Sequence, residues 1–248
     1  MGRASTTARF LPRWQLDGVT GAVVVVDVIR AFTTAAYAFG AGAEAIYLVA
    51  SVEEALALIR THPHVLAMGE EHGRRVAGFT FSNSPVEVSR ADLAGRTLVQ
   101  RTSAGTQSVV AATHATRLWC ASLVCGSATA RAIKNADIGV PTYIISGRFA
   151  DRPDDSGDDD LACAEYIEAI RISRGIDEDG TIERIANSDE AHRTLQLGVG
   201  NVDPDDIGFG TRLDVFDFAM EATHTSLGIC IRPTRDQRAA KLPIPPKN

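Results

Sequence analysis

Short apolar runs and helical stretches alternate along the chain from Gly21 onward. The runs are rich in β-branched residues and show little alternation of apolar with polar positions, as expected when helices cover both faces of a sheet. The expected strands and helices are Ala22–Val28 and Arg30–Phe39, Ala45–Val49 and Val52–Arg60, Val65–Met68, Thr97–Gln100 and Gly105–Thr113, and Arg117–Cys120 and Ser127–Asn135. This rhythm predicts an α/β fold with a largely parallel or mixed sheet flanked by helices.

The pattern becomes less regular in the second half of the chain. We expect a strand at Pro141–Ser146, a helix at Asp160–Ser173, and two final strands at Asp214–Met220 and Leu227–Ile231. Residues 1–20 are expected to form an N-terminal arm, residues 21–240 the α/β domain, and residues 241–248 a proline-rich tail. The weaker stretch at 175–200 is a candidate boundary that would divide the domain into two α/β subdomains.

Composition and charge narrow the class of protein. Hydrophobic residues make up 45% of the 248 positions and charged residues 23%, values typical of soluble globular proteins. The net charge of −6 argues against broad nucleic-acid binding, which needs a basic surface. No apolar run approaches the roughly 20 residues of a membrane helix, and no secretory signal is recognisable. We therefore expect a cytoplasmic enzyme without nucleic-acid or membrane partners.

The four cysteines show neither CxxC pairs nor zinc-site spacing, so reduced, buried thiols are expected. Cys125 and Arg131 have the bare Cys-x5-Arg spacing of cysteine phosphatases, whose mechanism needs a thiolate at a helix N-terminus. Two fixed positions are weak evidence for that chemistry. The nucleophilic aspartate of a DxD phosphatase is unsupported, because Ile29 stands where the second aspartate belongs.

Candidate chemistry lies where the predicted strands end, because ligands of open α/β sheets bind at the carboxyl ends of strands. Asp27 follows the first buried strand and Arg30 comes three residues later. A carboxylate there suits Mg²⁺, and an arginine can bind an anion in bidentate fashion. An equally weighted alternative is that Asp27 caps the following helix and pairs with Arg30.

Two further segments follow predicted strands. Glu70 comes after Val65–Met68, where it would serve as a metal ligand or general base, or would belong to a charged turn. The loop Thr102-Ser103-Ala104-Gly105-Thr106 precedes a helix, and its backbone amides are suited to an anion. An ordinary N-cap loop is an equally good interpretation of that segment.

Two more segments resemble helix starts. Asn83-Ser84-Pro85 has Ser84 at the cap position and Pro85 at the first helical position. The run Asp158-Asp159-Asp160 is a candidate cation site, because three neighbouring carboxylates repel one another. A solvated acidic cap is the more frequent outcome of such a run.

Taken together, five motifs in order resemble the 2-phosphosulfolactate phosphatase family. They are Asp27-Val-Ile-Arg30-Ala, Asn83-Ser-Pro85, Thr102-Ser-Ala-Gly-Thr106, Ala121-Ser122-Leu-Val-Cys-Gly-Ser127 and Asp159-Asp160-Leu-Ala-Cys163. The segments Asp203-Pro-Asp-Asp-Ile and Asp214-Val-Phe-Asp217 extend the resemblance, which spans about residues 22 to 232.

The resemblance implies a magnesium-dependent hydrolase that removes phosphate from 2-phospho-3-sulfolactate, a step toward coenzyme M in methanogens. We expect Asp27, Asp159 and Asp160 as metal ligands, and Asp27, Glu70 and Arg30 as catalytic residues. The residues expected to bind substrate are Arg30, Asn83, Ser84, Thr102, Ser103, Gly105, Thr106 and Ser122. A non-catalytic sensor of small anions is the alternative, and a homodimer is one option for the assembly.

Overall fold

The computed structural model describes residues 7–152 and 156–235. The tail expected at 241–248 and the first six residues of the expected arm lie outside the described residues. Residues 9–12 of that arm form a strand, β1, which pairs in parallel with β8 at one end of the sheet. Part of the expected arm is therefore built into the sheet.

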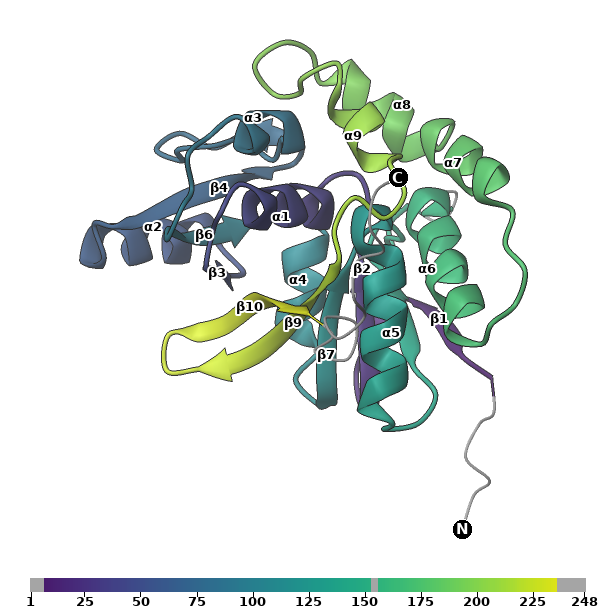
Figure 1. Cartoon of the computed structure of the whole chain (residues 1–248). Helices are drawn as coiled ribbons and strands as arrows, with labels where there is room; N and C mark the ends of the chain where they lie inside the picture. The colour runs from purple at the N-terminus through teal and green to yellow at the C-terminus, as the bar shows by residue number, and fades with distance from the viewer. Residues whose placement is uncertain (1–6, 153–155, 236–248) are drawn as a thin grey trace, which may run out of the picture.

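The described residues form a ten-stranded mixed sheet, which confirms the predicted α/β class (Figure 1). One parallel group has the order β1 (Arg9–Pro12), β8 (Thr142–Ile145), β2 (Gly21–Val26) and β7 (Ala115–Ala121). A second parallel group has the order β3 (Ala45–Leu48), β6 (Thr97–Arg101) and β4 (Val65–Glu71), and β5 (Arg74–Arg75) pairs with the end of β4. The antiparallel hairpin of β9 (Phe218–Thr225) and β10 (Gly228–Arg235) joins the two groups.

Helices cover both faces of the first strand group. Along β2, Val23 and Val25 pack with α1 (Ala31–Gly40) and α4 (Gly105–Ala111), whereas Val24 and Val26 pack with α5 (Gly126–Ala136) and α6 (Asp158–Arg171). All four valines are fully buried. This two-sided burial explains the continuous apolar run in the sequence.

The remaining helices are shorter or lie at the periphery. They are η1 (Arg13–Gln15), α2 (Val52–Thr61), α3 (Pro85–Ser89), η2 (Leu123–Cys125), α7 (Glu178–Ala186), α8 (Asp189–Gln196) and α9 (Asp206–Gly210). The weak-pattern region at 175–200 contains α7 and α8, whose residues Ile185 and Ala191 are buried in the same cluster as α6. That region packs onto α6, which covers one face of the first strand group. No helix among the described residues combines the length and apolar character that crossing a membrane would require.

The strand predicted at Asp214–Met220 is wrong in its first half, because β9 begins only at Phe218. Asp214 has a left-handed φ of 49°, and its amide donates to Leu123 O at 3.2 Å. The amide of Phe216 donates to Val124 O at 2.9 Å. Bonds to η2, rather than to a neighbouring strand, therefore hold this segment.

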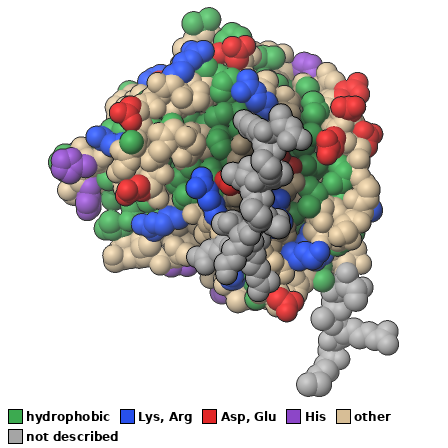
Figure 2. Space-filling view, viewed as in Figure 1, with side chains coloured by type: hydrophobic (Ala, Val, Ile, Leu, Met, Phe, Trp, Pro, Cys, Tyr) green, Lys and Arg blue, Asp and Glu red, His purple; other side chains and the backbone are tan. Residues whose placement is uncertain are grey.

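The two strand groups are turned strongly relative to each other across the β9–β10 hairpin (Figure 1). The turn brings the carboxyl ends of β2 and β8 close to those of β4 and β6, where residues that follow all four strands line one cavity. Basic and acidic side chains are interspersed on the face shown in Figure 2, and neither charge covers a continuous area of it.

Candidate active site

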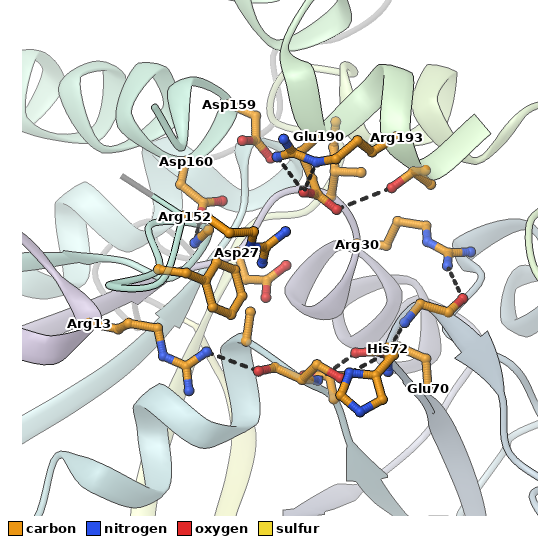
Figure 3. Close-up of a pocket in the computed structure, with 18 of the residues that line it drawn as sticks. Arg13, Asp27, Arg30, Glu70, His72, Arg152, Asp159, Asp160, Glu190 and Arg193 are labelled. Carbon is orange, nitrogen blue, oxygen red and sulfur yellow. Dashed lines mark hydrogen bonds and ion pairs between the residues drawn. The ribbon is translucent and has the colours of Figure 1, made fainter. Parts of the chain in front are cut away.

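A cavity of about 710 Å³ lies where the carboxyl ends of the strands meet. Its wall carries six carboxylates and four arginines, most of them labelled in Figure 3. They are Asp27, Glu70, Asp151, Asp159, Asp160, Glu190, Arg13, Arg30, Arg152 and Arg193. The structure thus brings the catalytic and metal residues expected from the sequence to one site, together with charged residues that the sequence did not indicate.

Asp27 directly follows β2 and is buried, with 5% of its surface exposed. Its Oδ1 accepts a hydrogen bond of 2.9 Å from the amide of Ala31 at the start of α1. Its Oδ2 faces Gly105, where a Cβ would lie only 2.7 Å away. Asp27 therefore fulfils the capping role with one oxygen and lines the cavity as well. It does not pair with Arg30, whose ion pair is with Asp206.

Asp160 ties the first turn of α6 to two strand ends. Its Oδ1 accepts from the amide of Val28 and its Oδ2 from the amide of Gly147, each at 2.8 Å. These bonds fix the carboxylate beside the end of β2 and the end of β8. Burial, followed by the charges of Asp159 and Asp27, raises the pKa of Asp160 well above its usual value, against the effect of the two amides.

Asp159 is equally buried but has an unused oxygen. Only 2% of its surface is exposed, and its Oδ1 has no hydrogen-bond partner among the described residues. Burial and the charges of Glu190 and Asp27 raise its pKa well above the usual value. A buried carboxylate oxygen without a partner is costly, and a bound cation would remove that cost.

The first of the three acidic residues at this helix points elsewhere. Asp158 forms an exposed ion pair with Arg184 at 2.6 Å. The run Asp158–Asp160 thus divides between a solvated pair and two carboxylates that line the cavity. The interpretation as a solvated acidic cap is confirmed for Asp158, and the cation site stays a prediction for Asp159 and Asp160.

We expect the metal-free protein to lose stability as the pH rises through the titration range of Asp27. Burial raises the pKa of this carboxyl to about 7, with smaller contributions from Glu190 and Glu70. Unfolded aspartate titrates near ~3.9, so between these values the folded state binds more protons and stability falls with rising pH. Urea unfolding in chelator should show the stability of the wild type falling relative to Asp27→Asn between about pH 5 and 7. A constant difference over this window would contradict the raised pKa.

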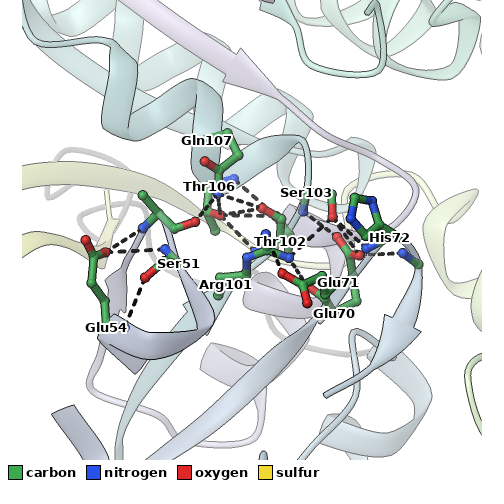
Figure 4. A network of polar contacts seen from close by, with 12 residues as sticks. Ser51, Glu54, Glu70, Glu71, His72, Arg101, Thr102, Ser103, Thr106 and Gln107 are labelled. Atoms are coloured by element: carbon green, nitrogen blue, oxygen red, sulfur yellow. Dashed lines mark hydrogen bonds and ion pairs between the residues drawn. The ribbon is translucent and has the colours of Figure 1, made fainter. Parts of the chain in front are cut away.

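Glu70 holds two loops together through a network of polar contacts (Figure 4), on the opposite side of the cavity from Asp159 and Asp160 (Figure 3). Its Oε1 accepts from the amide of Ser103 and its Oε2 from the amide of Gly73, both at 2.5 Å. The hydroxyl of Ser103 also donates to Oε2 at 3.0 Å. Because both oxygens accept backbone N–H groups, the geometry favours a positioning role over that of a general base.

The loop Thr102–Thr106 uses most of its amides within the protein. The amide of Thr106 donates to Thr102 Oγ1 at 3.1 Å, and the amide of Thr102 donates to Thr106 Oγ1 at 2.8 Å. The amide of Ser103 donates to Glu70 Oε1. Of the two sequence interpretations, the geometry favours the N-cap loop over an anion cradle.

Arg30 forms a buried ion pair that the sequence did not indicate. Its Nη1 donates to Asp206 Oδ2 at 3.0 Å, and the two side chains are 4% and 0% exposed. Asp206 Oδ1 also accepts from the hydroxyl of Ser84 at 2.5 Å. Asn83 lines the cavity beside this group and leaves its buried Oδ1 without a partner among the described residues.

Four of the residues expected to bind substrate lie outside the cavity lining, as does Cys125: they are Ser84, Gly105, Thr106 and Ser122. Ser122, expected to bind substrate, is fully buried, lies outside the cavity lining, and shares a hydrogen bond of 2.5 Å with Thr33 Oγ1. Cys125 is also fully buried, and burial raises its pKa to about 11. A thiol with a raised pKa is a poor nucleophile, so the geometry argues against the Cys-x5-Arg mechanism.

Helix α8 supplies cavity residues that sequence reasoning missed. Glu190 and Arg193 lie one turn apart and form an ion pair of 2.9 Å at the cavity wall. Their i,i+3 spacing is typical of any exposed helical pair, so the sequence held no signal that this helix borders the site. Asp206 had a weak signal, since it belongs to the Asp203–Asp206 segment of the family resemblance.

The donors present fit Mg²⁺. Among the described residues no group of three or more His, Cys, Asp or Glu side chains is arranged to hold a metal ion. Mg²⁺ does not need such a group, because it binds one or two carboxylates and completes its shell with water and substrate oxygens. The unpartnered Oδ1 of Asp159, near Asp27, is the observation that supports this fit.

Comparisons with known proteins show the family of this chain. The family model described as 2-phosphosulpholactate phosphatase matches residues 11–222. A protein of Bacillus subtilis (strain 168) named probable 2-phosphosulfolactate phosphatase is 35% identical over 80% of this chain and 85% of its own length. Proteins of the same name from Carboxydothermus hydrogenoformans and Thermotoga maritima are 32% and 30% identical over 77% and 78% of this chain, and over 74% and 85% of their own lengths.

Proposed function

The chain belongs to the 2-phosphosulpholactate phosphatase family, whose members are phosphoric monoester hydrolases, and we propose that it removes phosphate from a small phosphorylated acid with the help of Mg²⁺. The substrate proposed from the relatives' name is 2-phospho-3-sulfolactate, with 3-sulfolactate and phosphate as products. A cytoplasmic location and a role in coenzyme M synthesis belong to the same proposal.

One observation carries the proposal. Asp27, Asp159 and Asp160 are each at most 5% exposed, and they line one cavity together with Arg13, Arg30, Arg152 and Arg193. The mutual repulsion of three buried carboxylates favours a bound cation. Arginines beside them favour an anionic ligand, so the cavity suits a metal ion and a phosphate ester together.

Each group has a proposed role. Asp27 and Asp159 would hold the metal, and Asp160, fixed by the amides of Val28 and Gly147, would orient the start of α6 beside them. Mg²⁺, when bound, supplies charge neutralisation at the phosphoryl oxygens. Arg30 lines the cavity and is held there by its buried ion pair with Asp206. From this position it would attract the negative charge of the substrate.

A phosphate-release assay tests the proposal. We expect the purified protein to release phosphate from 2-phospho-3-sulfolactate in the presence of Mg²⁺. Excess chelator should lower this rate by at least about 100-fold, because the reacting phosphate would lack its cation. Added Mg²⁺ should restore the rate. Binding of the ester without release under any metal condition would contradict hydrolysis and support the sensor alternative. Activity that survives chelator but disappears in Cys125→Ser would instead establish cysteine chemistry.

A further inference from the structure

Arg13 occupies the end of the cavity that lies opposite α8 in Figure 3. It begins η1, directly after β1, and its side chain is half-buried. Its Nη1 donates to Ser103 O at 2.9 Å, and its Cζ lies 4.8 Å from the ring centroid of Phe149. One hydrogen bond and one cation–π contact therefore hold the guanidinium in the cavity wall.

The guanidinium of Arg13 lacks a carboxylate partner among the described residues. Arg30 and Arg193, which line the same cavity, form ion pairs with Asp206 and Glu190. Arg13 has only the backbone oxygen of Ser103 and the Phe149 ring. An arginine offers five N–H donors in a planar fork and keeps its charge, so this one has donors left for an anion.

The surroundings of Arg13 add to its preference for an anion. Arg152 packs on the same Phe149 ring, with its Cζ 3.8 Å from the ring centroid. Asp151 also lines this end, so two guanidiniums stand against one carboxylate there, whereas Asp27, Asp159 and Asp160 make the other end negative. Arg13 and Asp27 line the same cavity, so one small molecule bound there can contact both ends.

We propose that Arg13 binds the acid group of the substrate that is not the phosphate, a carboxylate or a sulfonate, and so selects phosphate esters that carry such a group. This inference rests on the proposed function, because it takes the ester phosphate to bind at the end of the cavity that contains Asp27 and Asp159. A planar fork can donate two parallel hydrogen bonds to either acid group. Loss of these bonds should weaken the binding of esters that carry an acid group and should leave the binding of esters without one nearly unchanged.

The test compares matched esters in the wild type and in Arg13→Gln. 2-Phospholactate has a carboxylate where isopropyl phosphate has a methyl group, and 2-phosphooxyethanesulfonate has a sulfonate where n-propyl phosphate has a methyl group. We expect Arg13→Gln to lower kcat/KM for at least one ester with an acid group by about 10- to 100-fold, the effect of losing charge-assisted hydrogen bonds. The corresponding ester without an acid group should change less than about threefold. The two pairs show whether carboxylate or sulfonate is preferred.

Calorimetric binding in chelator separates this inference from the proposed hydrolysis. The wild type should bind the esters with an acid group more tightly than their counterparts, and Arg13→Gln should lose that preference even if no ester is hydrolysed. Arg13→Lys, which keeps the charge without the fork, should retain part of it. Equal weakening of both esters in a pair, or a preference that survives in Arg13→Gln, would overturn the inference. Arg131→Gln, an exposed α5 arginine outside this cavity, is the matched control.

Discussion

Replacing Asp27 by Asn is expected to lower kcat by about 10³-fold or more while the protein stays folded. The amide has nearly the shape of the carboxylate and keeps an oxygen that can accept the 2.9 Å bond from the Ala31 amide. It lacks the negative charge that a magnesium site at Asp27 and Asp159 would need. Removing a buried charge whose pKa is raised to about 7 should also leave the metal-free protein at least as stable above that pH.

Phosphate release at saturating Mg²⁺, with circular dichroism and thermal unfolding of the same sample, measures both expectations for Asp27→Asn. The matched control is Asp17→Asn, which changes an exposed aspartate outside the cavity and should keep the wild-type rate. Wild-type turnover in Asp27→Asn at saturating Mg²⁺ would remove Asp27 from the proposed site. A variant that fails to fold would show that Asp27 acts chiefly as the cap of α1.

Local features of the fold could be predicted because they depend on neighbours in sequence. The buried valines of β2 predicted a strand covered on both faces, and Ser84-Pro85 predicted the start of α3. Ser84 does accept from the amide of Glu87 at 3.1 Å. The same hydroxyl donates to Asp206, which lies 122 positions further along the chain, and no local pattern indicates that contact.

Features that depend on the arrangement of distant segments could not be predicted. The β9–β10 hairpin joins the two parallel strand groups, and so determines which strand ends meet. Glu190 and Arg193 reach the cavity only because α8 packs beside α6. Asp27 could therefore be assigned to a strand end from the sequence, whereas its charged surroundings could not.

The acidic run at the start of α6 shows how an error of two residues in a helix start changes an interpretation. The sequence predicted a helix from Asp160, but α6 begins at Asp158. Successive residues of a helix point about 100° apart, since 3.6 residues make a turn. Asp158 therefore faces Arg184 at the surface, while Asp159 and Asp160 face the cavity. The helical step from Asp158 onward therefore determines which of the three carboxylates face the cavity.

Replacing Gly105 by Ala is expected to lower kcat by about 100-fold and the free energy of unfolding by about 1–3 kcal/mol, because the added methyl group overfills the space around Asp27. The sequence indicated Gly105 as a phosphate-binding residue, whereas the structure places it against Asp27. A Cβ there would lie 2.7 Å from Asp27 Oδ2 and 3.0 Å from the Cβ of Ala31. The φ of Gly105 is not in the left-handed region, so alanine suits the backbone of α4 and the effect comes from crowding.

Kinetics and urea unfolding of Gly105→Ala, alone and combined with Asp27→Asn, identify the cause of this effect. If the methyl group acts by displacing the Asp27 carboxylate, then Gly105→Ala should lower the kcat of the Asp27→Asn variant only slightly. The two changes affect the same group, so their effects should not add. Gly175→Ala, which adds a methyl group with no atom within 4 Å, is the control and should keep both activity and stability. Full activity in Gly105→Ala would show that turnover tolerates a shifted Asp27. If Gly105→Ala lowers kcat by the same factor in the wild type and in Asp27→Asn, Gly105 acts on the substrate directly, as the sequence indicated.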